Sequence, residues 1–571
     1  MAFPNCSSVG TGEDSARSHR LDSQIGVPSS SDSRLSLTDF YQVTMSYAYW
    51  KNNKHNDHAV FEMYFRKCPF DGEFAVLAGI DEVLRFINDF HFTDDEIGYL
   101  RKTLPHVEEE FLQYLSEIDG SRISLHAISE GTLVFPREPL LRVEGPLCVC
   151  QLLETPLLNL MNFPTLIATN AARYRLSAGW NKQLVEFGAR RAQGPDGAMS
   201  ASRYAYLGGF DATSNVRAGL SFGIPISGTH AHSFVTCFSD LSDLRVRSLG
   251  ECEDFISLVL EKRSAVYTLW EAETIVSKIN MSELAAFIAY AQASIPVALY
   301  YFHSHLHFCA FWIHSIHYIQ ITSKRTVEMR PLFSAARNEI ILRFRGLPNF
   351  LCVAFALYDL NYKPVGIRLD SGDLAYLSKE VRKKFVSASA AFNVPFEKLK
   401  IVASNNINEK VLKLLNEEGN EVDAFGIGTH LVTCQSQPAL GMVYKIVELN
   451  LKPCMKLSQD FDKITMPASK AVYRLYSSSG SPIIDLLDKT KNLEPVRLQK
   501  IFCRHLFDET KRCYVIPDKV AREKCIEALK LFRKDHLRLI NPTPYKISAS
   551  ESYYEYFRRI WSLLTPVDTI S

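Results

Sequence analysis

PVGIRLDSGDL, residues 364–374, joins a short apolar run to a cluster of small and acidic residues. The run has the length and composition of a buried strand, and the cluster after it is typical of a strand-to-helix turn. Arg368 interrupts the run, and a long cationic side chain is rarely buried without a partner. We therefore expect Arg368 to contact either a nearby carboxylate, such as Asp370, or an anionic ligand.

Four further stretches repeat this order of an apolar run, a polar or glycine-containing cluster and a helical segment. They are LVEF (184–187) before Arg190 and Arg191, GIPIS (223–227) before Thr229 and His232, KIVA (400–403) before Asn406, and DAFGIG (423–428) before Thr429. Buried strands that alternate with helices predict a parallel α/β architecture. In an α/β barrel the loops after the strands meet at one mouth, so these clusters should lie close together.

The composition narrows the class of protein. The chain has 571 residues, 47% of them hydrophobic, which is enough for two domains or a large barrel with additions. Its 64 basic and 63 acidic residues give a net charge of +1 and no reason to expect nucleic acid or a membrane as the main partner. The 13 cysteines are scattered without CxxC pairs, as in a cytosolic protein with reduced thiols. Residues 1–34 lack a signal peptide and have the composition of a disordered tail.

Each candidate residue also has a structural interpretation. Gly426 and Gly428 before Thr429 would let backbone N–H groups approach a phosphate, or would serve a tight turn. Arg190 suits a phosphate or a carboxylate, or a salt bridge at the barrel rim. An aspartate after the 366–369 run could hold ribose hydroxyls or a hydrated magnesium ion, or could cap a helix. His232 is either a reactive residue or a histidine satisfied within the core.

Taken together, the motifs resemble one family from about residue 35 to residue 475. They are LTDFYQVTM, FEMYFRKCPF, EFGARRAQGPDGAMSASRYAYLGGFDATSNV, SGTHAHSF, GIRLDSGDL, SNNINE and GIGTHLVT, and they look like nicotinate phosphoribosyltransferase. The resemblance implies an α/β protein of the type II phosphoribosyltransferase kind, with an irregular (β/α) barrel and an α/β sandwich built from both chain ends. We accordingly predict sandwich parts at 35–150 and 446–571 and a barrel at 151–445.

The resemblance also implies an activity: nicotinate and phosphoribosyl pyrophosphate give nicotinate mononucleotide and pyrophosphate, with ATP hydrolysis and Mg²⁺ or Mn²⁺. Such enzymes are cytosolic homodimers with shared active sites, and neither nucleic acid nor a membrane is an expected partner. The implied contacts with nicotinate come from Tyr41 (across the dimer), Thr229 and Arg368. His232, as a phosphohistidine, and Asp370 carry the catalytic roles. The phosphoribosyl group is implied to bind Thr429, Gly428, Gly426, Arg190 and Asn406; no metal ligand is assigned.

One segment departs from the family pattern. Residues 294–345 are about thirty residues longer than expected, lack the family's Asp-Thr-Tyr-Asp strand signature and contain five histidines. A splicing or gene-model difference would explain this segment and could leave the chain inactive. The two other interpretations of this segment are a metal site at His303, His305 and His307 and a membrane-spanning segment. Phe461 and Ala468 stand where the family favours Pro and Gly.

Two alternative functions therefore stay open. The chain could use nicotinamide in place of nicotinate, although an arginine favours the charged acid over the neutral amide. It could also be a catalytically impaired variant that acts only as a dimer partner. An aldolase-type barrel enzyme is disfavoured because no lysine sits at a strand end for Schiff-base chemistry.

Overall fold

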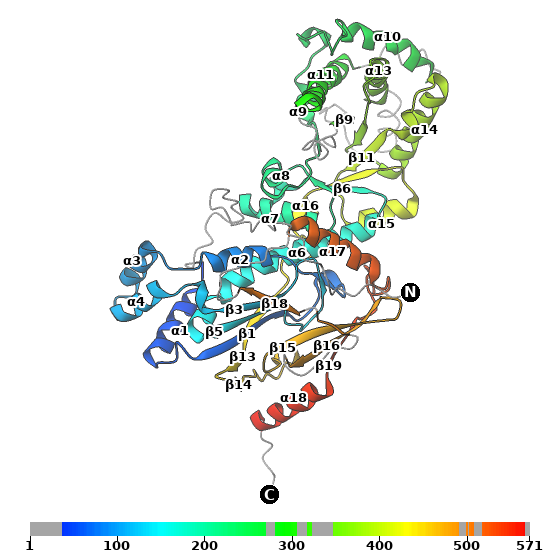
Figure 1. Cartoon of the computed structure of the whole chain (residues 1–571). Helices are drawn as coiled ribbons and strands as arrows, with labels where there is room; N and C mark the ends of the chain where they lie inside the picture. The colour runs from blue at the N-terminus through cyan, green and yellow to red at the C-terminus, as the bar shows by residue number, and fades with distance from the viewer. Residues whose placement is uncertain are drawn as a thin grey trace, which may run out of the picture.

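The computed structural model describes residues 37–269, 280–304, 317–321, 346–489, 498–500, 502–507 and 517–565. The predicted tail at 1–34 lies outside these residues, as do 305–316 and 322–345 of the atypical segment. The chain forms two parts, one around a parallel sheet and one around antiparallel sheets, with α6, α7, α16 and α17 between them (Figure 1).

The first part is built on a seven-stranded sheet in the order β7-β6-β12-β11-β10-β9-β8. All of its strand pairings are parallel. A parallel bridge links Thr213 of the edge strand β7 to Ile226, two residues before the other edge strand β8, which is compatible with closure of the sheet into a barrel. Its strands are β6 (Gln183–Glu186), β7 (Ala212–Thr213), β8 (Gly228–Thr229), β9 (His317–Ile321), β10 (Gly366–Leu369), β11 (Lys400–Ser404) and β12 (Ala424–Ile427).

Helices separate these strands along the chain, which is the order expected for an α/β architecture. They are α6 (Glu154–Ala178), α7 (Gly194–Leu207), α8 (Val216–Phe222), α9 (His232–Thr236), α10 (Phe255–Thr268), α11 (Met281–Ser304), α13 (Gly346–Asp359), α14 (Leu374–Phe392), α15 (Glu409–Glu418) and α16 (Thr429–Val432). Local sequence sets where α14 and α15 begin, because the side chains of Asp373 and Asn408 accept the N–H groups of Tyr376 and Val411.

The second part draws strands from both ends of the chain. Its six-stranded sheet has the order β14-β13-β1-β5-β3-β18, in which early and late strands lie side by side (Figure 1). A four-stranded sheet, β17-β15-β16-β19, comes from the later residues alone. The strands are β1 (His58–Phe65), β3 (Ser124–Ile128), β5 (Leu141–Pro146), β13 (Met442–Leu449), β14 (Lys452–Pro453), β15 (Lys470–Tyr476), β16 (Pro482–Lys489), β17 (Leu498–Lys500), β18 (Phe502–Phe507) and β19 (Lys546–Ala549).

Shorter elements complete this part: the strand pair β2 (Ala75–Val76) and β4 (Leu133–Val134), and the helices α1 (Phe40–Lys51), α2 (Ile80–Asn88), α3 (Asp94–Thr103), α4 (Glu109–Glu117), α5 (Leu147–Leu152), α17 (Asp518–Leu531) and α18 (Glu551–Leu564). The predicted combination of a parallel α/β part with a part built from both chain ends is confirmed. After the barrel, the chain enters the antiparallel sheet at Met442, the first residue of β13, which is four residues before the boundary of 446 predicted from the sequence.

The atypical segment contributes to the barrel wall. Its residues His317–Ile321 form β9, which pairs in parallel with β8 on one side and β10 on the other. His303 lies within the helix α11, whereas the proposed metal site assumed alternate positions of a strand. His305 and His307 lie outside the described residues, so the structure does not test that site further.

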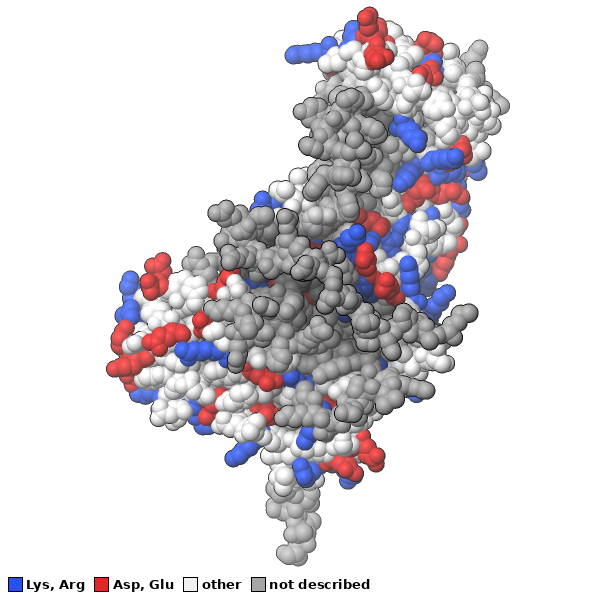
Figure 2. All heavy atoms as spheres, viewed as in Figure 1, with Lys and Arg blue, Asp and Glu red and all other residues white. Residues whose placement is uncertain are grey.

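Surface charge and helix hydropathy bear on the partner classes considered above. Acidic and basic side chains are interspersed over the coloured part of the face in Figure 2. Among the helices that the structure describes, none combines the length and the apolar character needed to span a bilayer.

Candidate active site

The guanidinium of Arg368 lies at the carboxyl end of β10 and is oriented by side chains from other strand ends of the sheet. Its Nε donates to Ser404 Oγ at 2.8 Å, and its Nη1 donates to Thr229 Oγ1 at 2.5 Å. Its Nη2 pairs with Asp370, whose Oδ1 also accepts a bond from Ser404 Oγ at 2.9 Å. Residues at the ends of β8, β10 and β11 therefore fix the plane of one arginine fork.

Thr229, Arg368 and Asp370 border a cavity of about 690 Å³. His232, the first residue of α9, lies on its wall with Nε2 3.4 Å from Asp370 Oδ2, and 57% of its side chain is exposed. Asp370 thus contacts both a guanidinium and an imidazole at the cavity wall. The lining residues are Phe187, Ala189, Arg190, Ser214, Val216, Ile226, Ser227, Gly228, Thr229, His230, Ala231, His232, Tyr290, Arg368 and Asp370.

His230 differs from its neighbour His232 because it is buried among aromatic rings. Its ring centroid is 4.8 Å from that of Tyr290 and 5.7 Å from that of Phe234. Burial lowers the pKa of His230 to about 4, with smaller contributions from the positive charges nearby. His230 therefore presents a neutral imidazole at neutral pH, whereas the exposed His232 faces the polar part of the cavity.

A buried carboxylate holds the loops at the opposite wall. Glu186, the last residue of β6, accepts bonds from Ser202 Oγ at 2.9 Å, from Thr213 Oγ1 at 2.6 Å and from the N–H of Gly188. Burial raises its pKa, while these hydrogen bonds act in the opposite direction. Glu186 thereby links the start of the loop that carries Arg190 to the end of β7.

Five predicted residues come together in this cavity: Arg190, Thr229, His232, Arg368 and Asp370. The contacts of Arg368 match the expectation of a carboxylate partner, which is Asp370. Asp373 is not part of the cavity lining and instead caps α14, as the structural interpretation of an aspartate in this cluster expected.

Gly426 within β12 and Gly428 after it lie beside the cavity lining without bordering the cavity itself. A Cβ on Gly426 would approach a ring carbon of Phe187 to 2.4 Å, and a Cβ on Gly428 would come within 3.2 Å of the Phe187 carbonyl. Close packing against Phe187 therefore explains both glycines. Thr429 is exposed at the start of the short helix α16, and Asn406 is exposed after β11 with a φ of 45°.

Tyr41 lies on α1 in the second part, with 48% of its surface exposed, and does not line the cavity of its own chain. Ser404 and Glu186 are site residues that motif reading did not select. A hydroxyl at the end of the KIVAS strand and a carboxylate inside the LVEF run are the signals that could have indicated them.

A parallel α/β barrel with an arginine, two hydroxyls, an aspartate and a histidine at its strand ends, joined to a part built from both chain ends, has the architecture of a type II phosphoribosyltransferase. The chain matches the model of the nicotinate phosphoribosyltransferase N-terminal domain over residues 37–162 and that of the C-terminal domain over residues 469–522 and 519–557.

Relatives along nearly the whole chain identify the family. A nicotinate phosphoribosyltransferase of Dictyostelium discoideum is 46% identical over 562 residues, which span 93% of this chain and 89% of that protein. Nicotinate phosphoribosyltransferase 1 of Arabidopsis thaliana is 45% identical, with 93% and 94% covered. The crystal structure of human nicotinic acid phosphoribosyltransferase aligns with a TM-score of 0.75 and 36% identity, covering 92% of this chain and 99% of the human one. The chain belongs to the nicotinate phosphoribosyltransferase family.

Proposed function

We propose that this chain transfers the phosphoribosyl group of phosphoribosyl pyrophosphate to nicotinate, the first step of NAD synthesis from that acid. The observation that carries the proposal is the oriented guanidinium of Arg368 at the wall of a cavity that also contains Thr229, Asp370 and His232. A cavity of about 690 Å³ lies in the range of small-molecule sites. In the reaction the bond from the ribose C1 to pyrophosphate breaks as the pyridine nitrogen bonds C1.

Arg368 is proposed to select the acid over the amide. A guanidinium recognises a carboxylate through two parallel charged hydrogen bonds, and a neutral carboxamide cannot form that pair. Thr229 and Ser404 hold the guanidinium in place, which reduces the cost of ordering it when the substrate binds. The side chain is 14% exposed, so it borders the cavity while its strand is buried.

Asp370 is proposed to stabilise the reacting ribose. Positive charge develops on the ring as pyrophosphate leaves, and a fixed carboxylate nearby lowers the energy of that state. Its contacts with Arg368, Ser404 and His232 hold the carboxylate in a fixed position before the substrate arrives. A carboxylate with these partners can also accept bonds from ribose hydroxyls.

His232 is proposed to accept the γ-phosphoryl group of ATP, which releases ADP; hydrolysis of the phosphohistidine later releases phosphate. Its exposure and its contact with Asp370 suit a group that reacts at the cavity wall. A Mg²⁺ or Mn²⁺ ion would neutralise the pyrophosphate. Among the described residues no cluster of three ligand-type side chains exists, and Asp370 is already engaged, so substrate oxygens would supply most of the ion's ligands.

A homodimer is proposed to complete the site. Tyr41 is exposed on α1, away from the cavity of its own chain, so a pyridine-stacking role requires the tyrosine of a second copy. The cytosol is the proposed location because the described cysteines are all free thiols. No nucleic-acid or membrane partner is proposed.

The decisive experiment follows products of the purified full-length chain with phosphoribosyl pyrophosphate, ATP and magnesium. We expect nicotinate mononucleotide and pyrophosphate with nicotinate, and much slower turnover with nicotinamide. The variant His232→Asn should lose the stimulation by ATP and keep some basal transfer. Absence of any mononucleotide would instead support the dimer-partner role, and preference for nicotinamide would support the amide-using alternative.

A further inference from the structure

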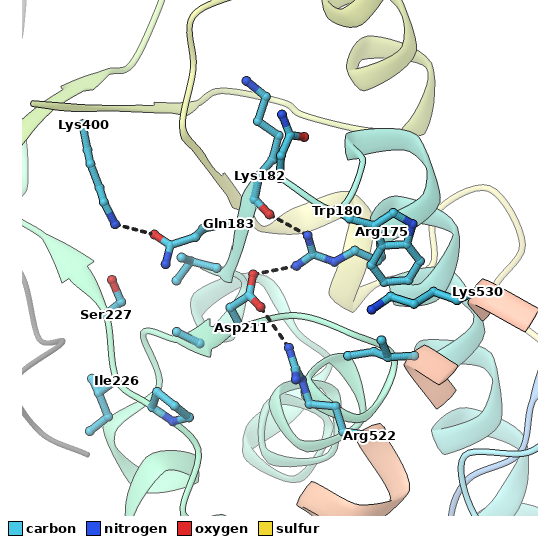
Figure 3. A pocket seen from close by; sticks show the side chains of 15 residues that line it. Arg175, Trp180, Lys182, Gln183, Asp211, Ile226, Ser227, Lys400, Arg522 and Lys530 are labelled. Atoms are coloured by element: carbon cyan, nitrogen blue, oxygen red, sulfur yellow. Dashed lines mark hydrogen bonds and ion pairs between the residues drawn. The ribbon is translucent and has the colours of Figure 1, made fainter. Parts of the chain in front are cut away.

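A second cavity, of about 480 Å³, lies at the opposite end of the barrel strands. It is bordered by Gln183, Lys400 and Ala212, the first residues of β6, β11 and β7, and by Arg522 and Lys530 of α17. The active-site cavity, by contrast, is lined by Phe187 and Ser214, which directly follow β6 and β7. We call the second one the amino-edge cavity; Figure 3 shows its lining.

Five basic side chains and one carboxylate, that of Asp211, line the amino-edge cavity. Three of the five are engaged by the protein itself. Arg522 donates to the Phe210 carbonyl and to Asp211, and its guanidinium lies over the Tyr206 ring. Arg175 donates to the carbonyls of Gly179, Lys182 and Gly209 as well as to Asp211, and the ammonium of Lys182 donates to a carbonyl. Burial lowers the pKa of Arg175, which indicates how dry this wall is.

The other two cations, Lys400 and Lys530, have few partners among the described residues. Lys400 Nζ donates to Gln183 Oε1 at 3.2 Å, and Arg522 shares Asp211 with Arg175 (Figure 3). Lys530 Nζ lies 5.0 Å from the centroid of the Trp180 indole. Since one carboxylate is shared by two arginines, the cavity keeps an excess of positive charge that suits an anionic ligand.

The remaining wall is flat and apolar. Trp180 is 45% exposed, and Pro225, Ile226 and Ile526 line the cavity with it. An aromatic face beside basic side chains suits a flat base attached to a phosphate. We propose that the amino-edge cavity binds a nucleoside phosphate, whose base lies against Trp180 beside Lys530 and whose phosphate contacts Lys400, on the other side of Asp211 (Figure 3).

The position of this cavity connects it to the active site and to the second part of the molecule. Ile226 and Ser227 line both cavities and directly precede Thr229, which accepts the bond from Arg368. Ser227 and Thr213 are also joined by a backbone hydrogen bond of 3.0 Å. A ligand held between α17 and the barrel would therefore alter the position of Thr229 and change the KM for nicotinate.

The test measures binding directly and therefore does not depend on the proposed catalytic function. AMP, inorganic phosphate and adenosine are titrated separately into the full-length chain, with calorimetry and tryptophan fluorescence as readouts. AMP should bind; Lys400→Ala and Lys530→Ala should each weaken it about tenfold, which corresponds to ~1.4 kcal/mol. Trp180→Phe should remove the fluorescence change. Lys413→Ala, at an exposed lysine of α15 elsewhere on the surface, is the matched control and should leave AMP binding unchanged.

The ligands and a background variant separate the possible outcomes. Binding of AMP should persist in Arg368→Ala, which alters the active-site cavity alone. Phosphate bound as tightly as AMP, with the same lysine dependence, would overturn the nucleoside part of the proposal. Absence of AMP binding, or AMP binding that neither lysine variant weakens, would overturn the site itself.

Discussion

The ion pairs at the mouth of the barrel differ from those in the second part of the molecule. The side chains of Arg368 and Asp370 keep 14% and 21% of their surface exposed and border a cavity. Those of Lys470 and Glu62 are 3% and 1% exposed, and their ammonium and carboxylate groups lie 2.6 Å apart. The partly exposed pair of Arg368 and Asp370 can bind a ligand from the cavity. The enclosed pair of Lys470 and Glu62 has no access to a ligand, so a substitution there can only affect the stability of the fold.

The buried pair is also satisfied by the backbone. Lys470 Nζ donates to the carbonyls of Met466 and Ala468 at 2.7 and 2.9 Å, and Glu62 accepts the N–H of Lys470 at 3.0 Å. Burial lowers the pKa of Lys470, and the Glu62 charge opposes that change. Similar chemistry therefore suits the proposed recognition role where it is partly exposed, and it links segments of the structure where it is enclosed.

The largest expected effect comes from breaking the enclosed pair. Lys470→Ala would leave the Glu62 carboxylate buried and unpaired, which should lower the free energy of unfolding by about 3–5 kcal/mol. Denaturant titration measures this loss. Lys463→Ala, which removes an exposed pair with Asp460, is the control and should change stability little. Equal stability of the two variants would show that burial does not distinguish the pairs.

The opposite pattern is expected at the barrel mouth. Arg368→Ala should lower kcat/KM for nicotinate by about 100-fold, because the carboxylate of the substrate loses its fork and its alignment. Stability should change far less than in Lys470→Ala. Arg368→Lys keeps the charge without the fork and should give an intermediate kcat/KM. Steady-state kinetics measure kcat/KM for each variant. A large loss of stability in Arg368→Ala with unchanged kcat/KM would show that Arg368 has a structural role and no role in binding nicotinate.

His230 extends the comparison to the pH dependence of stability, because it is a buried titratable group at the wall of the partly exposed site. Its folded pKa of about 4 lies below the ordinary value of 6.5, so the unfolded chain binds more protons between these values. Titration of His230 therefore leaves the free energy of unfolding unchanged above pH 6.5. As the pH falls from 6.5 toward 4, it lowers the free energy of unfolding, by about 2 kcal/mol at pH 5.

Unfolding of the protein and of His230→Phe at pH 7 and pH 5 measures this contribution. The variant should lose less stability between the two pH values, whereas His91→Gln on the surface should behave like the unchanged chain. The same pH dependence in all three proteins would place the titrating group elsewhere.

The sequence predicted β6, β10, β11 and β12 well because each combines an apolar run with a polar end. The run at 223–227 precedes β8 without forming a strand, and β7 and β9 were not predicted. That pattern located Thr229, Arg368 and Asp370, which the structure brings within bonding distance. It did not locate Glu186, because a buried carboxylate inside LVEF has no local signature of its three donors. The contact of α17 with the barrel is likewise determined by tertiary packing, over a separation of 311 residues between Arg522 and Asp211.

Gly426 and Gly428 illustrate a limit of motif reading. The GIGT pattern fitted either a phosphate-binding turn or a tight turn, and the structure shows that the ring and backbone of Phe187 occupy the space that a Cβ would need. A sequence pattern cannot tell whether a ligand or a side chain takes up that space.

The smallest expected effect concerns Ala468, next to the enclosed pair. Its φ of 64° is left-handed, a conformation that costs an L-residue roughly 1–2 kcal/mol and a glycine little, and the expectation of Gly at this position fits that conformation. Its carbonyl accepts a bond from Lys470, so the strain lies within the structural linkage. Ala468→Gly should therefore raise the free energy of unfolding by about 0.5–1 kcal/mol, less than the full strain because glycine also gains freedom in the unfolded chain. Denaturant titration beside Ala391→Gly, in the right-handed helix α14, provides the contrast, because that change should be destabilising; a loss of stability in both would contradict the strain at Ala468.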